Sequence, residues 1–308
     1  MQLQQNKTTN NKYQLMNHKT NTVIAGVDLS AVSSTVVKHA TAIAQHFGTP
    51  CVLVHVMPED FLTRYKDQAE DLYRSLHQQA DAKLSSFVAD QSPTATVERK
   101  ICKGKPVEQL NQVIREENAS LLVIAANDLT KKHLGTVASR CVRTAPCDVL
   151  ILRDWQGDTF DRILVCVDYS PMSAKALERA ASLAQSYGAH LEVIHVMFPP
   201  TEDYWGQVQS GRDENQEEYV AKVRARAQQQ MKSFLTACPV SLEGISHSEE
   251  ILESRFPSVA ITHKAMDSSA DLVVLGTHGM SGFVSNFIGS NAEKLLNDCA
   301  VSVLAVRD

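Results

Sequence analysis

This chain contains the segment Val23-Ile-Ala-Gly-Val-Asp28-Leu-Ser30 and, without gaps, its counterpart Ile163-Leu-Val-Cys-Val-Asp168-Tyr-Ser170. The two segments lie 140 residues apart (168 minus 28), and the same register holds as far as Met57 and Met197. Both begin with an uninterrupted apolar run, which is typical of a strand buried on both faces of a sheet. A register kept over this length indicates that the chain is a tandem duplication.

Two further matches extend the duplication. The segment 119–125 matches 270–276 at an offset of 151 (276 minus 125), and Gly135-Thr136 matches Gly289-Ser290 at an offset of 154 (289 minus 135). We therefore predict four parts, which are a disordered polar tail at 1–21, a first unit at 22–154, a linker at 155–161 and a second unit at 162–308. Units of this length have the usual size of a domain.

Each unit alternates apolar segments with segments of helical periodicity. We predict strands at 23–27, 51–57, 95–101, 121–125 and 149–152, and again at 163–167, 191–197, 240–245, 272–275 and 301–306. Ser170-Pro171 is typical of a helix start, and Gly48 and Gly188 are typical of helix ends. Strands that alternate with helices predict an α/β fold with a parallel, doubly wound sheet.

A glycine-rich loop follows the fourth strand of the second unit. It reads Gly276-Thr-His-Gly279, then nine residues, then Gly289-Ser290. Glycines let the main chain come close to a bound group, and the N-terminus of the following helix attracts an anion. The order of residues is neither that of a P-loop nor that of a dinucleotide fold. The loop predicts a phosphate cradle, and the alternative is a glycine-rich turn that binds nothing.

This glycine spacing resembles the nucleotide-binding loop of the ATP-binding branch of the universal stress protein family. The segment Val167-Asp-Tyr-Ser-Pro171 and the strand end His195-Val196 are also similar, and the resemblance spans 22–308 as two tandem copies. It implies two adenine-nucleotide alpha hydrolase-like domains, each a five-stranded parallel sheet of order 3-2-1-4-5 flanked by helices. It also implies ATP, ADP or AMP as the ligand, with Mg²⁺ as a candidate accompanying ion.

The resemblance implies roles for ten residues. Base and ribose would contact Cys166, Val167, Asp168 and Val196, and phosphates would be held by Gly276, His278, Gly279, Gly289, Ser290 and Asn291. Carboxylates accept hydrogen bonds from hydroxyl and amino groups, and main-chain N–H groups donate to phosphate oxygens. Two residues depart from the family's pattern, since Cys166 replaces Pro or Ala and Asn291 replaces Val. No catalytic residue and no metal ligand is predicted.

The first unit departs further from the family. It has Ala125 and Asp128 at the glycine positions, and only 129–134 separate them from Gly135. A carboxylate at position 128 would repel approaching phosphates, so only the second unit is predicted to be competent. The loop cations Lys131, Lys132 and His133 are more often solvated than part of an anion site.

Three other polar residues have ordinary structural interpretations. We expect Asp28 to accept hydrogen bonds from main-chain donors at the following helix start. His55 and His195 end apolar strands, where histidines are more often packed and hydrogen-bonded than catalytic. Only His278, inside the glycine loop, is a candidate donor to phosphate.

Composition narrows the classes of partner. The 308 residues are 44% hydrophobic and 21% charged, and the formal net charge of −5 gives no electrostatic footprint for nucleic acid. No apolar run approaches the roughly 18 residues of a membrane span. The seven cysteines show no CxxC spacing, so neither a disulfide framework nor a zinc site is indicated. We interpret them as small core residues of a protein in a reducing cytoplasm. We therefore expect a cytoplasmic protein with no nucleic acid and no membrane partner.

The leading hypothesis is an adenine-nucleotide-binding regulatory protein of the stress response, with one site in the second unit. One alternative is a slow ATPase or autokinase at that site. The other is an interaction scaffold or a binder of a small apolar ligand, for which the segments 57–103 and 198–255 are candidates. A regulatory protein is a further candidate partner. We expect the last strands of the two units to pair as an intrachain pseudo-dimer, which is either monomeric or forms a homodimer through other surfaces.

Overall fold

The computed structural model describes residues 22–57, 69–91, 95–126, 134–153, 159–201, 216–279 and 288–307. The predicted polar tail, residues 155–158 of the predicted linker and parts of the two middle segments lie outside the described residues. So do four residues of the first unit's loop, namely Asp128, Lys131, Lys132 and His133.

Each half of the chain forms five strands in the spatial order predicted. The first half contains β1 (Val23–Val27), α1 (Ser33–Phe47), β2 (Cys51–Met57), α3 (Ala69–Gln91), β3 (Val97–Lys103), α4 (Pro106–Glu116), β4 (Leu121–Ala125), α5 (Thr136–Thr144) and β5 (Asp148–Leu152). The second half contains β6 (Arg162–Cys166), α6 (Pro171–Tyr187), β7 (His190–Met197), α8 (Gln216–Ala237), β8 (His247–Glu253), α9 (Pro257–Asp267), β9 (Leu272–Gly276), α10 (Ser290–Asp298) and β10 (Ser302–Val306). The strands run parallel within each half, in the orders β3-β2-β1-β4-β5 and β8-β7-β6-β9-β10, which confirms the order 3-2-1-4-5.

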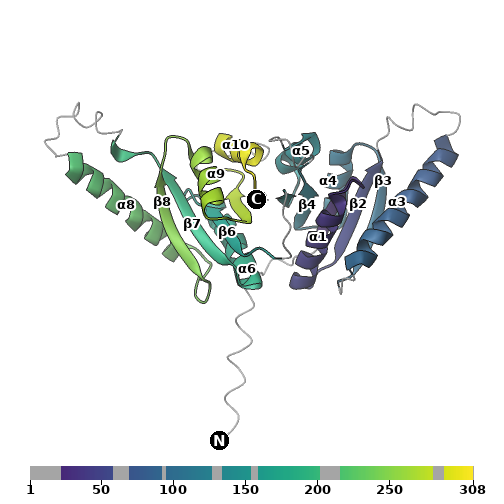
Figure 1. Ribbon diagram of the computed structural model, residues 1–308, viewed down its shortest axis with the longest axis horizontal. Helices are drawn as coiled ribbons and strands as arrows, with labels where there is room; N and C mark the ends of the chain where they lie inside the picture. The colour runs from purple at the N-terminus through teal and green to yellow at the C-terminus, as the bar shows by residue number, and fades with distance from the viewer. Residues whose placement is uncertain are drawn as a thin grey trace, which may run out of the picture.

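Helices cover both faces of the sheet because alternate strand residues point to opposite sides. In β1, Val23 and Ala25 join the core beneath α1, α3, α6 and α8, whereas Ile24 joins the core beneath α4, α5, α9 and α10. Each of these cores contains residues from both halves. The helices α5 and α10 lie near each other at the centre of the molecule (Figure 1).

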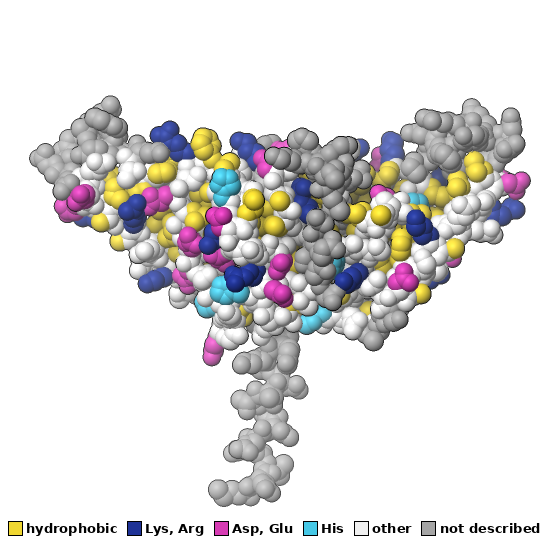
Figure 2. Space-filling view, viewed as in Figure 1, with side chains coloured by type: hydrophobic (Ala, Val, Ile, Leu, Met, Phe, Trp, Pro, Cys, Tyr) yellow, Lys and Arg dark blue, Asp and Glu magenta, His cyan; other side chains and the backbone are white. Residues whose placement is uncertain are grey.

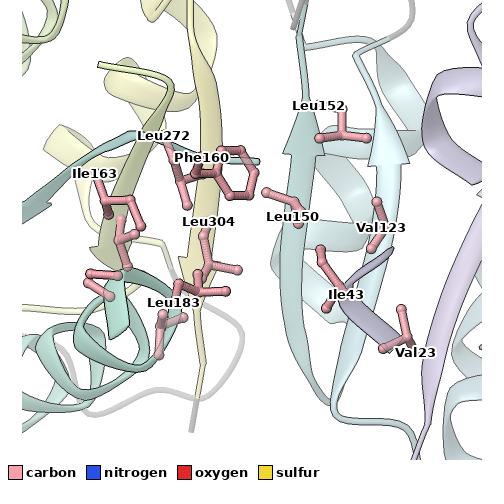
Figure 3. Close-up of a cluster of buried hydrophobic side chains, with 14 of the residues drawn as sticks. Val23, Ile43, Val123, Leu150, Leu152, Phe160, Ile163, Leu183, Leu272 and Leu304 are labelled. Carbon is pink, nitrogen blue, oxygen red and sulfur yellow. The ribbon is translucent and has the colours of Figure 1, made fainter. Parts of the chain in front are cut away.

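The two halves meet through their last strands, as predicted. β5 pairs with β10 in antiparallel fashion, with Leu150 opposite Leu304, so that ten strands form one sheet. Leu150 projects from β5 toward Phe160 and Leu304 on the other side (Figure 3). This pairing leaves neither inner edge of the two sheets exposed.

Two arginines make reciprocal contacts across this junction. Arg153 follows β5 and its Nη2 donates to the carbonyl oxygen of Leu296 in α10 at 2.7 Å. Arg307 follows β10 and its Nη1 donates to the carbonyl oxygen of Val142 in α5. Both pairs are related by the offset of 154 (307 minus 153, and 296 minus 142). The contact therefore has the self-complementary character of a two-fold interface, and each cation lies at a helix C-terminus, where it is stabilising.

One pair of equivalent positions breaks this symmetry. The Asp148 carboxylate is 8% exposed and accepts hydrogen bonds from Arg179 Nε and from the main-chain N–H of Arg307, both at 2.9 Å. Its counterpart is Ser302, whose hydroxyl accepts from the main-chain N–H of Arg153 at 3.2 Å. Burial raises the pKa of the Asp148 carboxyl, and the neighbouring Arg179 opposes that shift. An ion pair thus joins the first half to α6 on one side of the junction only.

The prediction of a strand at 240–245 is wrong. This segment forms a turn in which Gly244 has φ of 80° and Ile245 donates from N–H to the carbonyl oxygen of Leu242 at 3.1 Å. The third strand of the second half is β8, and its sequence, His-Ser-Glu-Glu-Ile-Leu-Glu, contains only two apolar residues. β8 is an outer edge strand, and charged side chains are favoured there because they oppose pairing with other chains. β3, the other outer edge, begins two residues later than the predicted strand at 95–101.

We expect Arg153→Met to lower the free energy of unfolding by about 2 kcal/mol, because hydrogen bonds to charged groups contribute roughly 1.5–3 kcal/mol. The variant keeps most of the aliphatic stem and removes the bond to Leu296. The measurement is urea denaturation followed by circular dichroism. The exposed Arg226, on α8, supplies the control Arg226→Met, which we expect to change stability by less than about 0.5 kcal/mol. Equal effects from the two variants would contradict the role given to Arg153.

Candidate functional site

The site forms where two neighbouring parallel strands end. β6 and β9 are parallel neighbours, with Val165 opposite Val274. The segments that follow these two strands therefore leave the sheet side by side, at the carboxyl ends of the strands. Asp168 follows β6, and the glycine loop follows β9. The two segments come so close that a Cβ atom added to Gly279 would lie 2.6 Å from Asp168 Oδ2. A side chain at position 279 would therefore force the Asp168 carboxylate to shift.

A cavity of about 440 Å³ opens at this edge of the sheet, and all ten residues predicted from the sequence line it. They are Cys166, Val167, Asp168, Val196, Gly276, His278, Gly279, Gly289, Ser290 and Asn291. A volume of this size lies within the range of small-molecule sites, about 300–1,000 Å³. The structure therefore brings the predicted residues together in one place, and their roles in binding stay predictions.

The Asp168 carboxylate is held by the turn that follows β6. Its Oδ1 accepts hydrogen bonds from the main-chain N–H of Ser170 at 3.1 Å and from the Ser170 hydroxyl at 2.5 Å. Tyr169 between them has φ of 66°, an uncommon left-handed conformation that allows this local bond. The Ser170 oxygen in turn accepts from the N–H of Ser173 and caps α6, as predicted. Oδ2 is thereby directed to Gly279 and the cavity.

The first turn of α10 supplies donors to the opposite end of the cavity. α10 begins at Ser290, and its N-cap residue is Gly289, which has no side chain to cap the helix as Ser170 caps α6. The Gly289 N–H donates to the carbonyl oxygen of Thr277 at 2.9 Å, which fixes the helix entrance against the glycine loop. Main-chain N–H groups in a first helical turn have no partner within the helix, and the helix dipole favours an anion there. Ser290, Asn291 and Ala292 of this turn all line the cavity.

The His278 ring is held by its neighbour Thr277. His278 Nδ1 lies 3.0 Å from the buried Thr277 hydroxyl, which also lies 3.1 Å from the carbonyl oxygen of Val306. The Nε2 atom of His278 is buried and has no hydrogen-bond partner among the described residues. When Nε2 carries a proton it can donate to a phosphate, which is the role predicted for His278.

The remaining walls of the cavity are mostly apolar. They come from the end of β7 and from α9, with Ile194, Val196, Pro257 and Ile261 among the lining residues. Burial raises the pKa of the Cys166 thiol far above its ordinary value, so Cys166 contributes a neutral wall. This end of the cavity suits a planar apolar group, whereas the α10 end suits an anion.

His195 is packed and hydrogen-bonded, as predicted, and also lines the cavity. Its Nδ1 donates to the carbonyl oxygen of Val167 at 2.8 Å, and its ring stacks on Tyr169 with 4.2 Å between centroids. Asp28 and His55 behave in the same way in the first half. Asp28 accepts from the N–H of Ser30 at 2.9 Å, and His55 Nδ1 donates to the carbonyl oxygen of Val27 at 3.0 Å.

Sequence reasoning missed nine lining residues. They are Ser173, Ile194, His195, Pro257, Ile261, Leu275, Thr277, Ala292 and Leu295. The repeat contained a signal for some of them, because Ser173 and His195 have identical counterparts at Ser33 and His55. The helix α9 carries no motif, so its two lining residues become visible only when it packs beside β7.

The charge around the site limits the ions that it can hold. Asp168 is the one carboxylate among the lining residues, and no Lys or Arg is among them. The described residues contain no cluster of three or more His, Cys, Asp or Glu side chains suited to a metal. Mg²⁺ is commonly bound by one carboxylate together with phosphates and water. Asp168 stands alone as a carboxylate among the described lining residues, so the donor set fits Mg²⁺ only as an ion carried by the phosphates of a ligand.

The face of the molecule in Figure 2 shows Lys and Arg side chains interspersed with Asp and Glu, rather than gathered into one patch. None of the described helices is both long and apolar enough to cross a membrane.

Comparison with known proteins assigns the family. The model of the universal stress protein family matches residues 19–153 and again 159–307. A universal stress protein of Thermus aquaticus is 32% identical over 149 residues, which cover 48% of this chain and 99% of that protein. One of Mycobacterium bovis is 25% identical over 304 residues, which cover 92% and 96% of the two chains.

Solved structures show the same fold. A protein of unknown function from Pseudomonas aeruginosa superimposes with a TM-score of 0.67 at 19% identity, over 94% of this chain and 93% of that chain. A universal stress protein from Archaeoglobus fulgidus gives a TM-score of 0.63 at 20% identity, over 94% and 96% of the two chains. The chain therefore belongs to the universal stress protein family and carries two copies of its domain in tandem.

Proposed function

We propose that this protein binds an adenine nucleotide, ATP in particular, in the cavity of its second half. The observation that carries the proposal is the convergence of three features on one cavity of about 440 Å³. These are the first turn of α10 after its N-cap Gly289, the close approach of Gly279 to Asp168, and an apolar wall opposite. A nucleotide combines an anion, a polar sugar and a planar base, and each of these parts matches one feature.

The orientation of the ligand follows from the chemistry of the walls. Phosphates lie against the main-chain N–H groups at the start of α10 and in the glycine loop. Ribose hydroxyls donate to Asp168 Oδ2, which accepts no hydrogen bond within the described part of the chain. The base lies between Val196 and α9, where Pro257 and Ile261 line the cavity.

The proposed role is regulation in the stress response, and membership of the universal stress protein family supports it. Binding at α10 places the nucleotide next to the junction between the halves. Glu293 in the first turn of α10 is paired with Arg143 of α5, and Arg153 contacts the last turn of the same helix. A nucleotide that holds α10 thus acts on an element that both halves share.

We expect Gly279→Ala to weaken ATP binding at least tenfold, about 1.4 kcal/mol, because the added Cβ atom would displace the Asp168 carboxylate. Isothermal titration calorimetry with ATP measures the change. The control Gly48→Asn replaces a helix-end glycine of the first half whose Cβ position is open and whose φ of 64° asparagine tolerates. Full ATP affinity in Gly279→Ala, or an equal loss in Gly48→Asn, would contradict the proposal.

We expect His278→Ala to weaken ATP binding about tenfold, because hydrogen bonds to charged groups contribute roughly 1.5–3 kcal/mol and the buried Nε2 atom has no partner among the described residues. Isothermal titration calorimetry with ATP measures the change. Unchanged ATP affinity in His278→Ala would refute this role of His278.

A further inference from the structure

The first half contains a second cavity at the matching edge of its sheet. It has a volume of about 270 Å³ and lies at the ends of β1, β2 and β4. We propose that this cavity binds an uncharged purine nucleoside, so that the chain has one nucleotide site and one nucleoside site. The inference rests on the proposed function in one respect. It assumes that the base of the nucleotide lies against the corresponding walls of the cavity in the second half.

The walls of the two cavities correspond along the chain. Val27, Asp28 and Val56 line the first cavity, and their counterparts at an offset of 140 (168 minus 28), Val167, Asp168 and Val196, line the second. The helix wall corresponds as well. Pro106 and Leu110 of α4 match Pro257 and Ile261 of α9 at an offset of 151 (257 minus 106). The surroundings proposed for base and ribose are therefore present in both halves.

Asp28 presents an acceptor to the first cavity, as Asp168 does to the second. Its Oδ1 accepts from the N–H of Ser30 at 2.9 Å and from the Ser33 hydroxyl at 3.0 Å. Its Oδ2 accepts no hydrogen bond within the described ranges of the chain. Burial works to raise the pKa of Asp28, but the hydrogen bonds from Ser30 and Ser33 outweigh it and hold the pKa below its ordinary value. The carboxylate is thus ionised at neutral pH and can accept from ribose hydroxyls or an amino group.

The phosphate end of the second cavity has no equivalent among the described residues of the first. There the lining consists of Ala125, Val137 and Ala138, and none of these supplies a polar side chain. The helix entrance also differs, because the chain enters α5 through Gly135 at φ of 70° but enters α10 through Gly289 at φ of −58°. Gly289 lines its cavity, and Gly135 does not line the first one.

These differences select the class of ligand. Among the described lining residues, a phosphate at the first site would meet apolar side chains and the Asp28 carboxylate, and burying an unpaired charge is costly. A nucleoside has no such charge. Its base can occupy the apolar walls, and its hydroxyls can reach Asp28. The smaller volume, about 270 Å³ against about 440 Å³, agrees with a ligand that lacks phosphates.

The test uses calorimetry on the full chain with adenosine and, separately, with ATP. We expect two adenosines but only one ATP to bind per chain. Asp28→Asn keeps Oδ1 as the acceptor for Ser30 and replaces Oδ2 by a donor. This variant should bind one adenosine and retain full ATP affinity. The matched variant Val196→Trp, which fills the base end of the second cavity, should bind one adenosine and no ATP.

Binding of one adenosine to the wild type, abolished by Val196→Trp, would overturn the inference while the proposed function stands. Two adenosines bound by Asp28→Asn, with unchanged affinities, would also overturn it. If Asp28→Asn is poorly folded by circular dichroism, Val56→Trp provides the second variant, and the same loss of one adenosine is expected. Failure of the proposed function has a different signature, namely no ATP binding by the wild type at sub-millimolar concentration.

Discussion

The parallel pairing of β6 with β9 is the constraint on which the site depends. Parallel neighbours end at one edge of the sheet, so this single register places Asp168 beside the glycine loop. The N–H of Gly289 donates to the carbonyl oxygen of Thr277, so the start of α10 lies against the same edge. The anion end and the carboxylate of the cavity therefore have fixed separation, because both are set by the hydrogen bonds of a central sheet.

Duplication has kept this scaffold in both halves, while the linings of their cavities differ. The junction preserves the symmetry, since Arg153 and Arg307 bind the ends of α10 and α5 in the same way. The cavities do not preserve it. The walls formed by the strand ends and by α4 or α9 correspond in the two cavities, but the linings differ where α5 and α10 begin. The chain therefore presents two cavities with unequal linings around one continuous pair of cores.

The sequence predicts the central strands and the glycine loop well, because they depend on local patterns. An unbroken apolar run such as Val23–Val27 has one interpretation in this context, and the spacing from Gly276 to Ser290 is distinctive. Edge strands are harder, because β8 is polar and resembles a loop, while the apolar segment before it forms a turn. The surroundings of His278 are beyond sequence reasoning, since its Nδ1 lies beside a Thr277 hydroxyl that also contacts the carbonyl oxygen of Val306 in another strand. Likewise, Pro257 and Ile261 join the site only through the packing of α9.

The central claim is that main-chain N–H groups of the second half surround a triphosphate. The most direct test is a crystal structure of the full chain with a non-hydrolysable ATP analogue. The account predicts phosphate oxygens within hydrogen-bond distance of the N–H groups at the start of α10, and a ribose hydroxyl on Asp168. A triphosphate bound beside Asp28 in the first half, or the chain's own side chains filling the cavity between Gly276 and Ser290, would contradict it.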